Sequence, residues 1–317
     1  MMRQYRFIGW GLLLALLLSI SACRNGGAAG HAALTPEQAR LAHISRIDSV
    51  TLPNLLRLDS IEGYDKLAEL SAEAWVLVDD STGMVISQKY ANEPNFMASL
   101  TKMMTCLLAI ENGNMADTVV ITKDAFVARD SRVRLGDSYQ MANLVYEMML
   151  QSDNDAAYAL AWHLAGDTLK FCDMMNQKAA YLGMDSTHFA NPNGMPNLNN
   201  YSTACDLLRL ARYSMRDSTF AAIVGTAYKD VPLADGRHMP CHNTNALLGT
   251  YEGCIGIKTG FTRQAGNCLA SAATRNGDTL YLILLNSRSM SSRFTESAVL
   301  LDYGFRVMQA YHALRNQ

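Results

Sequence analysis

The sequence has few charged residues and no concentration of positive charge. Only 18% of its 317 residues are charged, the formal net charge is -2, and no basic run occurs outside the extreme N-terminus. Because binding to phosphates requires clustered Lys and Arg, this composition argues against nucleic acid as a partner. Internal repeats and low-complexity tracts are also absent. The length suffices for one large domain or two modest domains, each with a well-buried core.

The spacing of the seven cysteines excludes further classes of site. No C-x-x-C pair occurs, which argues against a zinc or thioredoxin-like site, so we expect neither metal nor cofactor. Apart from Cys23, the cysteines are Cys106, Cys172, Cys205, Cys241, Cys254 and Cys268. Export would permit disulfides, and Cys241 and Cys254 are the pair closest in sequence. The apolar sequence around most of the six favours small buried hydrophobic residues instead.

The N-terminus is typical of an export signal. Arg3 and Arg6 precede an uncharged apolar run at 7–20, and small residues follow it. A transmembrane helix is the alternative, but this run is shorter than the roughly 20 residues that span a bilayer. The sequence Ile-Ser-Ala-Cys ending at Cys23 resembles a bacterial lipobox, which predicts a signal peptide at 1–22 and a lipid on Cys23. We therefore expect an exported lipoprotein anchored to the periplasmic or outer face of a bacterial membrane.

The rest of the chain divides into two parts by composition and hydrophobic pattern. Residues 23–70 begin as a Gly- and Ala-rich tether and continue as a polar segment, with a helix start at Thr35. Residues 71–317 carry the periodic segments of a packed domain. Two apolar strands at its start are joined by a Gly-containing turn, and three more strands follow one another between 253 and 287. A helix is predicted at 97–113, and a long helix closes the chain.

The order of these elements predicts the fold. Helical periodicity dominates 116–239, whereas strands lie on both sides of that region. A single sheet must therefore recruit strands from both ends of the domain. We expect an α/β (α+β) fold, with a mainly antiparallel five-stranded sheet flanked by helices and an all-helical lobe. The cleft between lobe and sheet is the expected site.

Ser99 and Lys102 are the first residues along the chain that could take part in catalysis. They lie three apart in the apolar stretch Met-Ala-Ser-Leu-Thr-Lys-Met-Met, so a helix places them on one face. A serine hydroxyl needs a base to become a nucleophile, and a lysine can be that base only when neutral. Burial lowers the pKa of a lysine and so favours the neutral form. The S-x-x-K pattern alone is weak, because it occurs by chance in a chain of this length.

Two further motifs give the first one meaning. Ser152, Asp153 and Asn154 lie where one helical segment ends and another begins, which is also typical of a helix cap. Lys-Thr-Gly at 258–260 lies on a predicted strand. The order S-x-x-K, S-x-N, K-T-G is the mark of penicillin-binding proteins and class A β-lactamases.

With these motifs and the phrases around them, the chain resembles the D-alanyl-D-alanine carboxypeptidases, the low-molecular-mass penicillin-binding proteins of peptidase family S11. The resemblance runs from about Trp75 to Phe305. It covers ASLTKMMT, QSDNDAA, MNQKAAYLGM, FANPNGM, YSTACDL, NTNALLG, GIKTGFTRQAG and LLDYGF. It implies a β-lactamase/transpeptidase-like fold and a catalytic domain within 71–317.

The resemblance also implies roles for individual residues. Ser99 is the acyl-forming nucleophile, Lys102 is its base, and Ser152 passes the proton to the leaving D-alanine. The remaining residues bind substrate. Asn154 binds the peptide backbone, Lys258 and Thr259 bind the terminal carboxylate, and Lys258 also supplies positive charge near Lys102. Gly260 leaves the strand edge open, the backbone N–H groups of Phe261 and Ser99 bind the oxyanion, and Arg293 lies in the region of the carboxylate. For Arg293 a surface helix-cap residue is the alternative.

Some positions depart from the family pattern. Met97 replaces the usual Pro, Asp153 stands where Gly is more frequent, and Thr244 stands where some members carry Arg. No Glu occurs from Asp153 to Tyr251, the region in which a class A β-lactamase carries its deacylating glutamate. We therefore expect β-lactams to acylate Ser99 and to leave slowly.

These inferences predict a penicillin-binding serine carboxypeptidase that removes D-alanine from peptidoglycan stems ending in D-Ala-D-Ala. The expected partners are those stem peptides, β-lactams as covalent inhibitors, and a membrane through the N-terminal lipid. Two alternatives stay open. One is a DD-endopeptidase of the same family, and the other is a non-catalytic, lipid-anchored wall-binding protein.

Overall fold

The computed structural model describes Thr35, Gln38, Leu41 and residues 56–126 and 131–316. The chain divides into two compact units, Met1–Ala39 and Arg40–Gln317. In the smaller unit, the backbone N–H of Gln38 donates to Thr35 Oγ1 (3.1 Å) and that of Thr35 donates to Gln38 Oε1 (3.0 Å). This reciprocal exchange is a capping box and confirms the predicted helix start. The expected signal peptide and Cys23 lie outside the described residues.

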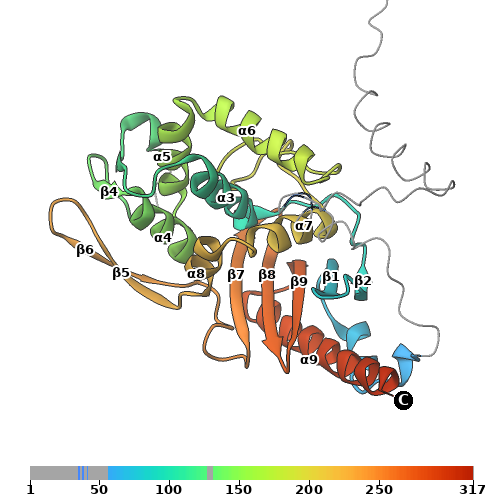
Figure 1. Cartoon of the computed structure of the whole chain (residues 1–317). Coiled ribbons are helices and arrows are strands. Elements are labelled where there is room, and N and C mark those ends of the chain that lie inside the picture. The colour runs from blue at the N-terminus through green and yellow to red at the C-terminus, as the bar shows by residue number, and fades with distance from the viewer. Residues whose placement is uncertain (1–34, 36–37, 39–40, 42–55, 127–130, 317) are drawn as a thin grey trace, which may run out of the picture. The chain divides into compact units, whose positions relative to one another are not determined.

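The larger unit combines a sheet with a group of helices (Figure 1). Its α-helices and strands in chain order are β1 (Ala74–Asp79), β2 (Val85–Lys89), α3 (Lys102–Asn112), β3 (Thr118–Val120), β4 (Ser138–Gln140), α4 (Met141–Gln151), α5 (Asn154–Ala165), α6 (Thr168–Tyr181), α7 (Ala204–Ser214), α8 (Ser218–Gly225), β5 (Tyr228–Pro232), β6 (His238–His242), β7 (Cys254–Thr262), β8 (Gly266–Arg275), β9 (Asp278–Ser287) and α9 (Met290–Arg315). Short 3-10 helices are η2 (Leu58–Ser60), η3 (Asp65–Glu69), η4 (Ala98–Thr101) and η5 (Lys123–Ala125).

The main sheet has five strands in the order β2-β1-β9-β8-β7, and every neighbouring pair is antiparallel. The N-terminal hairpin therefore pairs with the C-terminal strands through β1 and β9, which confirms the predicted recruitment from both ends of the domain. One edge of the sheet is β7, the strand that carries the Lys-Thr-Gly motif.

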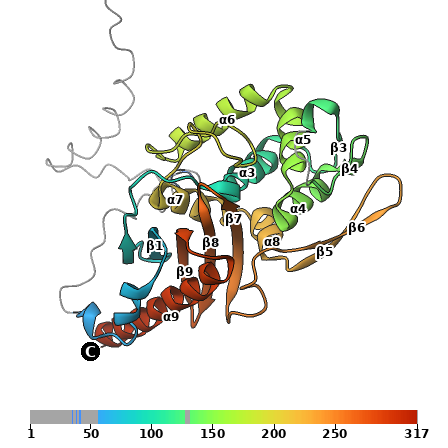
Figure 2. The same cartoon turned by 180° about the vertical axis from the view of Figure 1, so that it is seen from behind.

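Alternating side chains cover both faces of the sheet. Along β1, Val76 and Val78 pack into the larger core with the helices of the middle region, whereas Trp75 and Leu77 pack into a second core with α9. This two-residue alternation is the pattern of a strand buried on both faces. Figure 2 shows α9 along the sheet, whereas helices α3 to α6 gather beyond the ends of the strands that lie away from α9. No helix among the described residues is long and apolar enough to cross a membrane.

The middle region contains strands that the sequence did not predict. Besides helices, it holds the two-stranded pairs β3–β4 and β5–β6. In β5 and β6 only Val231 and Cys241 are fully buried, so the hairpin lacks the regular apolar alternation that identifies a strand in a sequence. The expected all-helical character of 116–239 is therefore wrong in these places.

Candidate active site

The predicted nucleophile lies just before α3, in a tighter turn than expected. Ser99 belongs to the 3-10 helix η4, and the α-helix begins only at Lys102. The spacing of three still brings the two side chains together, with 3.0 Å between Lys102 Nζ and Ser99 Oγ. Ala98, immediately before Ser99, has a φ of 48°. A positive φ is costly for a residue with a Cβ, so the surrounding structure must hold this turn in place.

Two glycines make room for the turn. At Gly194, which has a φ of +86°, a Cβ atom would lie 1.9 Å from the carbonyl oxygen of Ala98. At Gly260 on β7, a Cβ atom would lie 3.1 Å from Met97 O and 3.2 Å from the backbone nitrogen of Ser99. The backbone of β7 therefore approaches the nucleophile turn so closely that a side chain at Gly260 would be crowded. This contact places the Ser99 N–H beside the edge strand.

Lys102 has two further acceptors besides Ser99. Its Nζ donates to Asn154 Oδ1 (2.8 Å) and to the backbone carbonyl of Asn193 (2.8 Å). Three acceptors match the three donors of an ammonium, whereas a neutral amine has two hydrogens for Asn154 and Asn193 and a lone pair that can accept from the Ser99 hydroxyl. Within the described part of the chain, Ser152 is not among these partners.

The loop that carries Asn193 had no assigned role in the sequence. It is fixed internally: Asn191 Oδ1 accepts from the N–H of Gly194 (2.7 Å), and Asn193 Oδ1 accepts from that of Met195 (3.0 Å). Thr105 on α3 donates to Pro192 O (2.6 Å) and ties the loop to the helix. The Asn-Pro-Asn-Gly run signals such a turn, but no local pattern shows that its carbonyl meets a lysine ninety residues earlier.

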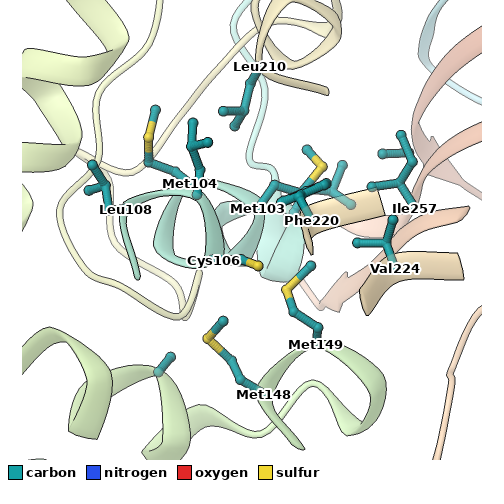
Figure 3. Packing of buried hydrophobic residues seen from close by; sticks show 14 of the residues in the cluster. Met103, Met104, Cys106, Leu108, Met148, Met149, Leu210, Phe220, Val224 and Ile257 are labelled. Atoms are coloured by element: carbon teal, nitrogen blue, oxygen red, sulfur yellow. The ribbon is translucent and has the colours of Figure 1, made fainter. Parts of the chain in front are cut away.

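Apolar side chains surround α3 and keep water from the lysine. Figure 3 shows Met103, Met104 and Cys106 on α3, with Cys106 facing Met148 and Met149 of α4 and Met104 on the opposite side of the helix. All five are buried, as is Lys102 itself. Flexible thioether side chains fill irregular spaces well, so this packing leaves little room for solvent around α3.

Burial sets the proton affinity of Lys102. Desolvation lowers its pKa from 10.5 to about 7, and the negative charge of Asp153 raises the pKa by a smaller amount. Burial also lowers the pKa of Lys258 well below its ordinary value, and the charges of Lys102 and Arg293 lower it further. The positive charge of one lysine thus disfavours the charge of the other. A neutral Lys102 at neutral pH follows mainly from its dry surroundings.

The turn between α4 and α5 holds the second motif. Ser152 ends α4 with a φ of 63°, and Asp153 caps α5 by accepting from the N–H of Ala156 (2.9 Å). The buried Asp153 carboxylate also accepts from Ser131 Oγ (2.7 Å) and from the N–H of Arg132 (2.7 Å). The expected helix cap is therefore present, and it serves the site as well, because it fixes the turn that carries Ser152 and Asn154.

The third motif lies on β7, and its polar side chains are buried. Lys258 is 1% exposed and donates to the carbonyl of Thr259 (3.1 Å), and Thr259 is 4% exposed. The hydroxyl of Thr259 lies 2.7 Å from that of Thr244, so the residue at the position of the family arginine forms part of the same cluster. Phe261 follows at the open end of the strand, with its ring exposed.

Arg293 lies inside this cluster and not on the surface. It is 5% exposed, and its Nη1 donates to the carbonyl of Gly260 (3.1 Å). The cap of α9 is Ser289, which accepts from the N–H of Ser292 (3.0 Å). The alternative of a surface helix cap is therefore wrong. Burial lowers the pKa of the Arg293 guanidinium, yet an arginine keeps its charge in proteins and so provides a fixed cation behind β7.

The cysteines take no part in this chemistry. The six between Cys106 and Cys268 are free thiols, and all but the half-buried Cys254 are buried. This agrees with the interpretation as small buried hydrophobic residues, and the permitted pair Cys241–Cys254 is not formed. Among the described residues, no group of His, Cys, Asp and Glu is arranged to hold a metal ion.

Comparison with known proteins agrees with this geometry. The chain is 36% identical to a D-alanyl-D-alanine carboxypeptidase of Streptomyces sp. (strain K15) over 255 residues, which are 74% of this chain and 88% of that protein. It is 30% identical to D-alanyl-D-alanine carboxypeptidase DacF of Bacillus subtilis (strain 168), of which it spans 64%. The crystal structure of the Streptomyces K15 DD-transpeptidase superposes with a TM-score of 0.71 at 33% identity, covering 74% of this chain and 97% of the other.

The fold and the family are therefore both established. The superposition confirms the predicted β-lactamase/transpeptidase-like fold. The sequence profile of peptidase family S11, the D-alanyl-D-alanine carboxypeptidases, matches residues 62–289, which is well over half of the chain. The chain belongs to the S11 family of D-alanyl-D-alanine carboxypeptidases.

Proposed function

We propose that this protein is a serine-type carboxypeptidase that removes the terminal D-alanine from peptidoglycan stem peptides. The observation that carries the proposal is the contact between Ser99 and a fully buried Lys102, whose pKa of about 7 permits a neutral amine. A neutral amine 3.0 Å from a serine hydroxyl is the arrangement that general-base activation requires.

Acylation begins when Lys102 takes the proton of Ser99 Oγ and the oxygen attacks the carbonyl carbon of the penultimate D-alanine. The negative charge that develops on the carbonyl oxygen is met by the backbone N–H groups of Ser99 and Phe261. The approach of β7 to the nucleophile turn at Gly260 supports this pairing of N–H groups. Lys102 then returns this proton through Ser152 to the leaving nitrogen, the C–N bond breaks, and D-alanine departs, which leaves an acyl-enzyme on Ser99.

The substrate is held at both ends of the reacting bond. Lys258 and Thr259 bind the terminal carboxylate, and the buried guanidinium of Arg293 adds a fixed positive charge to that side. Asn154 binds the peptide on the other side through the amide group that it does not share with Lys102. A bound carboxylate also favours the charged form of Lys258, because it offsets the repulsion from neighbouring cations.

Water completes the reaction: Lys102 accepts its proton as it attacks the acyl carbon, the ester bond to Ser99 Oγ breaks, and the proton returns to that oxygen. The absence of Glu between Asp153 and Tyr251 supports slow loss of a penicilloyl group, since this stretch offers no carboxylate of the kind that class A β-lactamases use. β-Lactams are therefore covalent inhibitors of this protein and poor substrates.

The two alternatives receive less support. A non-catalytic wall-binding protein has no need to keep Ser99, Lys102, Ser152 and Lys258 together, yet all four motif residues are present. The family description that matches the chain names carboxypeptidase activity, which disfavours an endopeptidase.

Product analysis separates the three functions. The purified protein is incubated with a muropeptide pentapeptide and, separately, with a crosslinked dimer. We expect free D-alanine from the pentapeptide and little cleavage of the dimer. Monomers released from the dimer without D-alanine release from the pentapeptide would indicate an endopeptidase. No product from either substrate would contradict an enzymatic role.

We also propose that Cys23 carries a lipid that anchors the protein to a bacterial membrane, on its periplasmic or outer face. The lipobox-like sequence before Cys23 supports this, and Cys23 lies outside the described residues. Cell fractionation tests the proposal. Wild-type protein is expected in the membrane fraction and the Cys23→Ala variant in the soluble fraction, whereas a variant that stays with the membrane would count against the lipid.

A further inference from the structure

A second hollow lies beside the nucleophile turn, outside the cluster of motif residues. Its volume is about 410 Å³, within the range of small-molecule sites. Three segments contribute most of its wall: the approach to the nucleophile turn at 94–96, the loop at 198–201, and the turn between β7 and β8. The lining residues are Glu73, Pro94, Asn95, Phe96, Leu198, Tyr201, Gln264 and Asn286.

The wall of this hollow is fixed by hydrogen bonds. The backbones of Asn95 and Ser202 exchange two of them, at 2.7 and 3.0 Å. At the other side, the side-chain amide of Asn286 donates to the carboxylate of Glu73 (2.5 Å). A pre-formed wall of this kind loses little conformational freedom when a ligand binds.

The chemistry of the lining selects the class of ligand. Phe96 and Tyr201 offer aromatic rings, while the amides of Asn95, Gln264 and Asn286 offer both donors and acceptors. A pyranose ring presents a C–H face that packs on an aromatic ring and a rim of hydroxyl groups that hydrogen-bond to amides. No lining residue is Lys or Arg, and Glu73 is acidic, so phosphates and carboxylates are disfavoured. The mixture suits a neutral, hydroxyl-rich sugar.

The position of the hollow relates it to the substrate. In the proposed reaction the terminal carboxylate lies at Lys258 and Thr259 and the reacting carbonyl at Phe261. The amino-terminal part of the stem therefore continues along β7 toward the turn that carries Gln264. Gln264 is at most about 10 Å from Phe261, since a strand rises about 3.3 Å per residue. The four stem residues on the amino-terminal side of the reacting bond span roughly 13 Å when extended and thus reach the hollow.

We propose that this hollow binds an N-acetylated amino sugar of the glycan strand to which the stem peptide is attached. The direction of the stem rests on the proposed carboxypeptidase function. Binding at both ends aligns the stem with β7 and makes the glycan-bearing substrate the preferred one. Each sugar contact contributes to the binding of the substrate and leaves the bond-breaking residues untouched.

Paired substrates test the proposal. D-alanine release is measured with a disaccharide pentapeptide and with the same pentapeptide without sugars, and kcat/KM is normalised to the fraction of protein that penicillin labels. We expect the glycan-bearing substrate to be preferred about three- to tenfold, the range that one or two hydrogen bonds supply. In Gln264→Ala and Tyr201→Ala the ratio should fall toward one. The matched controls Gln309→Ala and Tyr228→Ala, on α9 and β5, should keep the wild-type ratio.

Binding of the peptide-free disaccharide tests the hollow independently of turnover. Titration of the Ser99→Ala variant, followed by NMR or calorimetry, should show weak saturable binding that Gln264→Ala or Tyr201→Ala removes. Equal kcat/KM for both substrates, or disaccharide binding that both variants leave unchanged, would overturn the proposal. If neither substrate released D-alanine, the proposed function would fail, and the titration would still decide whether the hollow binds sugar.

Discussion

The pH dependence of acylation is the sharpest consequence of the buried lysine. Only the neutral amine of Lys102 can take the serine proton, and its pKa is about 7. About one tenth of the protein therefore carries the neutral base at pH 6 and about nine tenths at pH 8. We expect the second-order rate of acylation by a fluorescent penicillin to rise about tenfold between these pH values, with its midpoint near 7.

The contribution of Asp153 to the pKa of Lys102 provides a second test of this prediction. Its carboxylate raises the pKa of Lys102, so its removal lowers that pKa. The Asp153→Asn variant should therefore have its midpoint at lower pH than wild type, and it retains an oxygen to accept from the N–H of Ala156. Asp235→Asn, an exposed substitution on the β5–β6 turn, serves as the control and should leave the midpoint in place.

The assay is a time course of covalent labelling at each pH, quenched and read on a denaturing gel. Loss of the native fold at the pH limits is checked by circular dichroism. A profile that is flat from pH 6 to pH 8, or one that still rises steeply above pH 9, would refute the assignment of Lys102 as the neutral base. A midpoint in Asp153→Asn that moves to higher pH would contradict the electrostatic argument.

Three further predictions follow from particular contacts. Gly194→Ala should cost about 2–5 kcal/mol of stability in urea unfolding and abolish acylation, because the new Cβ would clash with Ala98 O. The control Gly236→Ala has a similar φ of +84° and open space around it, and should cost only about 1–3 kcal/mol. Arg293→Leu should lower kcat/KM for D-Ala-D-Ala substrates about tenfold, because Gly260 loses a charged donor; unchanged kinetics would show that the donor is unimportant. Burial raises the pKa of Glu147 from 4.5 to about 7, so its stabilising effect is present below pH 4.5 and lost as pH rises through 7. Glu147→Gln should therefore add about 3 kcal/mol at pH 8 and little at pH 4.5, and an equal gain at both would contradict this sign.

Much of the fold was predictable because its signals are local. The strands that became β1, β2, β7, β8 and β9 have apolar segments bounded by turns, and β1 keeps its hairpin partner β2 on one side while it pairs with β9 on the other. The motif residues were predictable for a different reason. Their spacing and order are set by chemistry, and S-x-x-K keeps its geometry in a 3-10 turn as well as in an α-helix.

The rest depends on contacts between segments far apart in the sequence. The turn at Ala98, with its positive φ, has room only because Gly194 and Gly260 lie against it, and neither is near it in the chain. The carbonyl of Asn193 reaches Lys102 through a loop whose composition indicates a turn and nothing more. Arg293 opens a helix with a polar first turn, a pattern typical of the surface, yet β7 and β8 bury it. No periodicity within one segment carries this information.

The central claim is that Ser99 is a nucleophile activated by a neutral Lys102, and the mass of the protein after exposure to benzylpenicillin tests it most directly. At pH 8 the wild type should gain the mass of one intact antibiotic molecule, which peptide mapping places on Ser99. Lys102→Arg, which keeps a cation but cannot lose its proton, should gain none on the same timescale. Labelling of Lys102→Arg at the wild-type rate, or an adduct on a residue other than Ser99, would contradict the account.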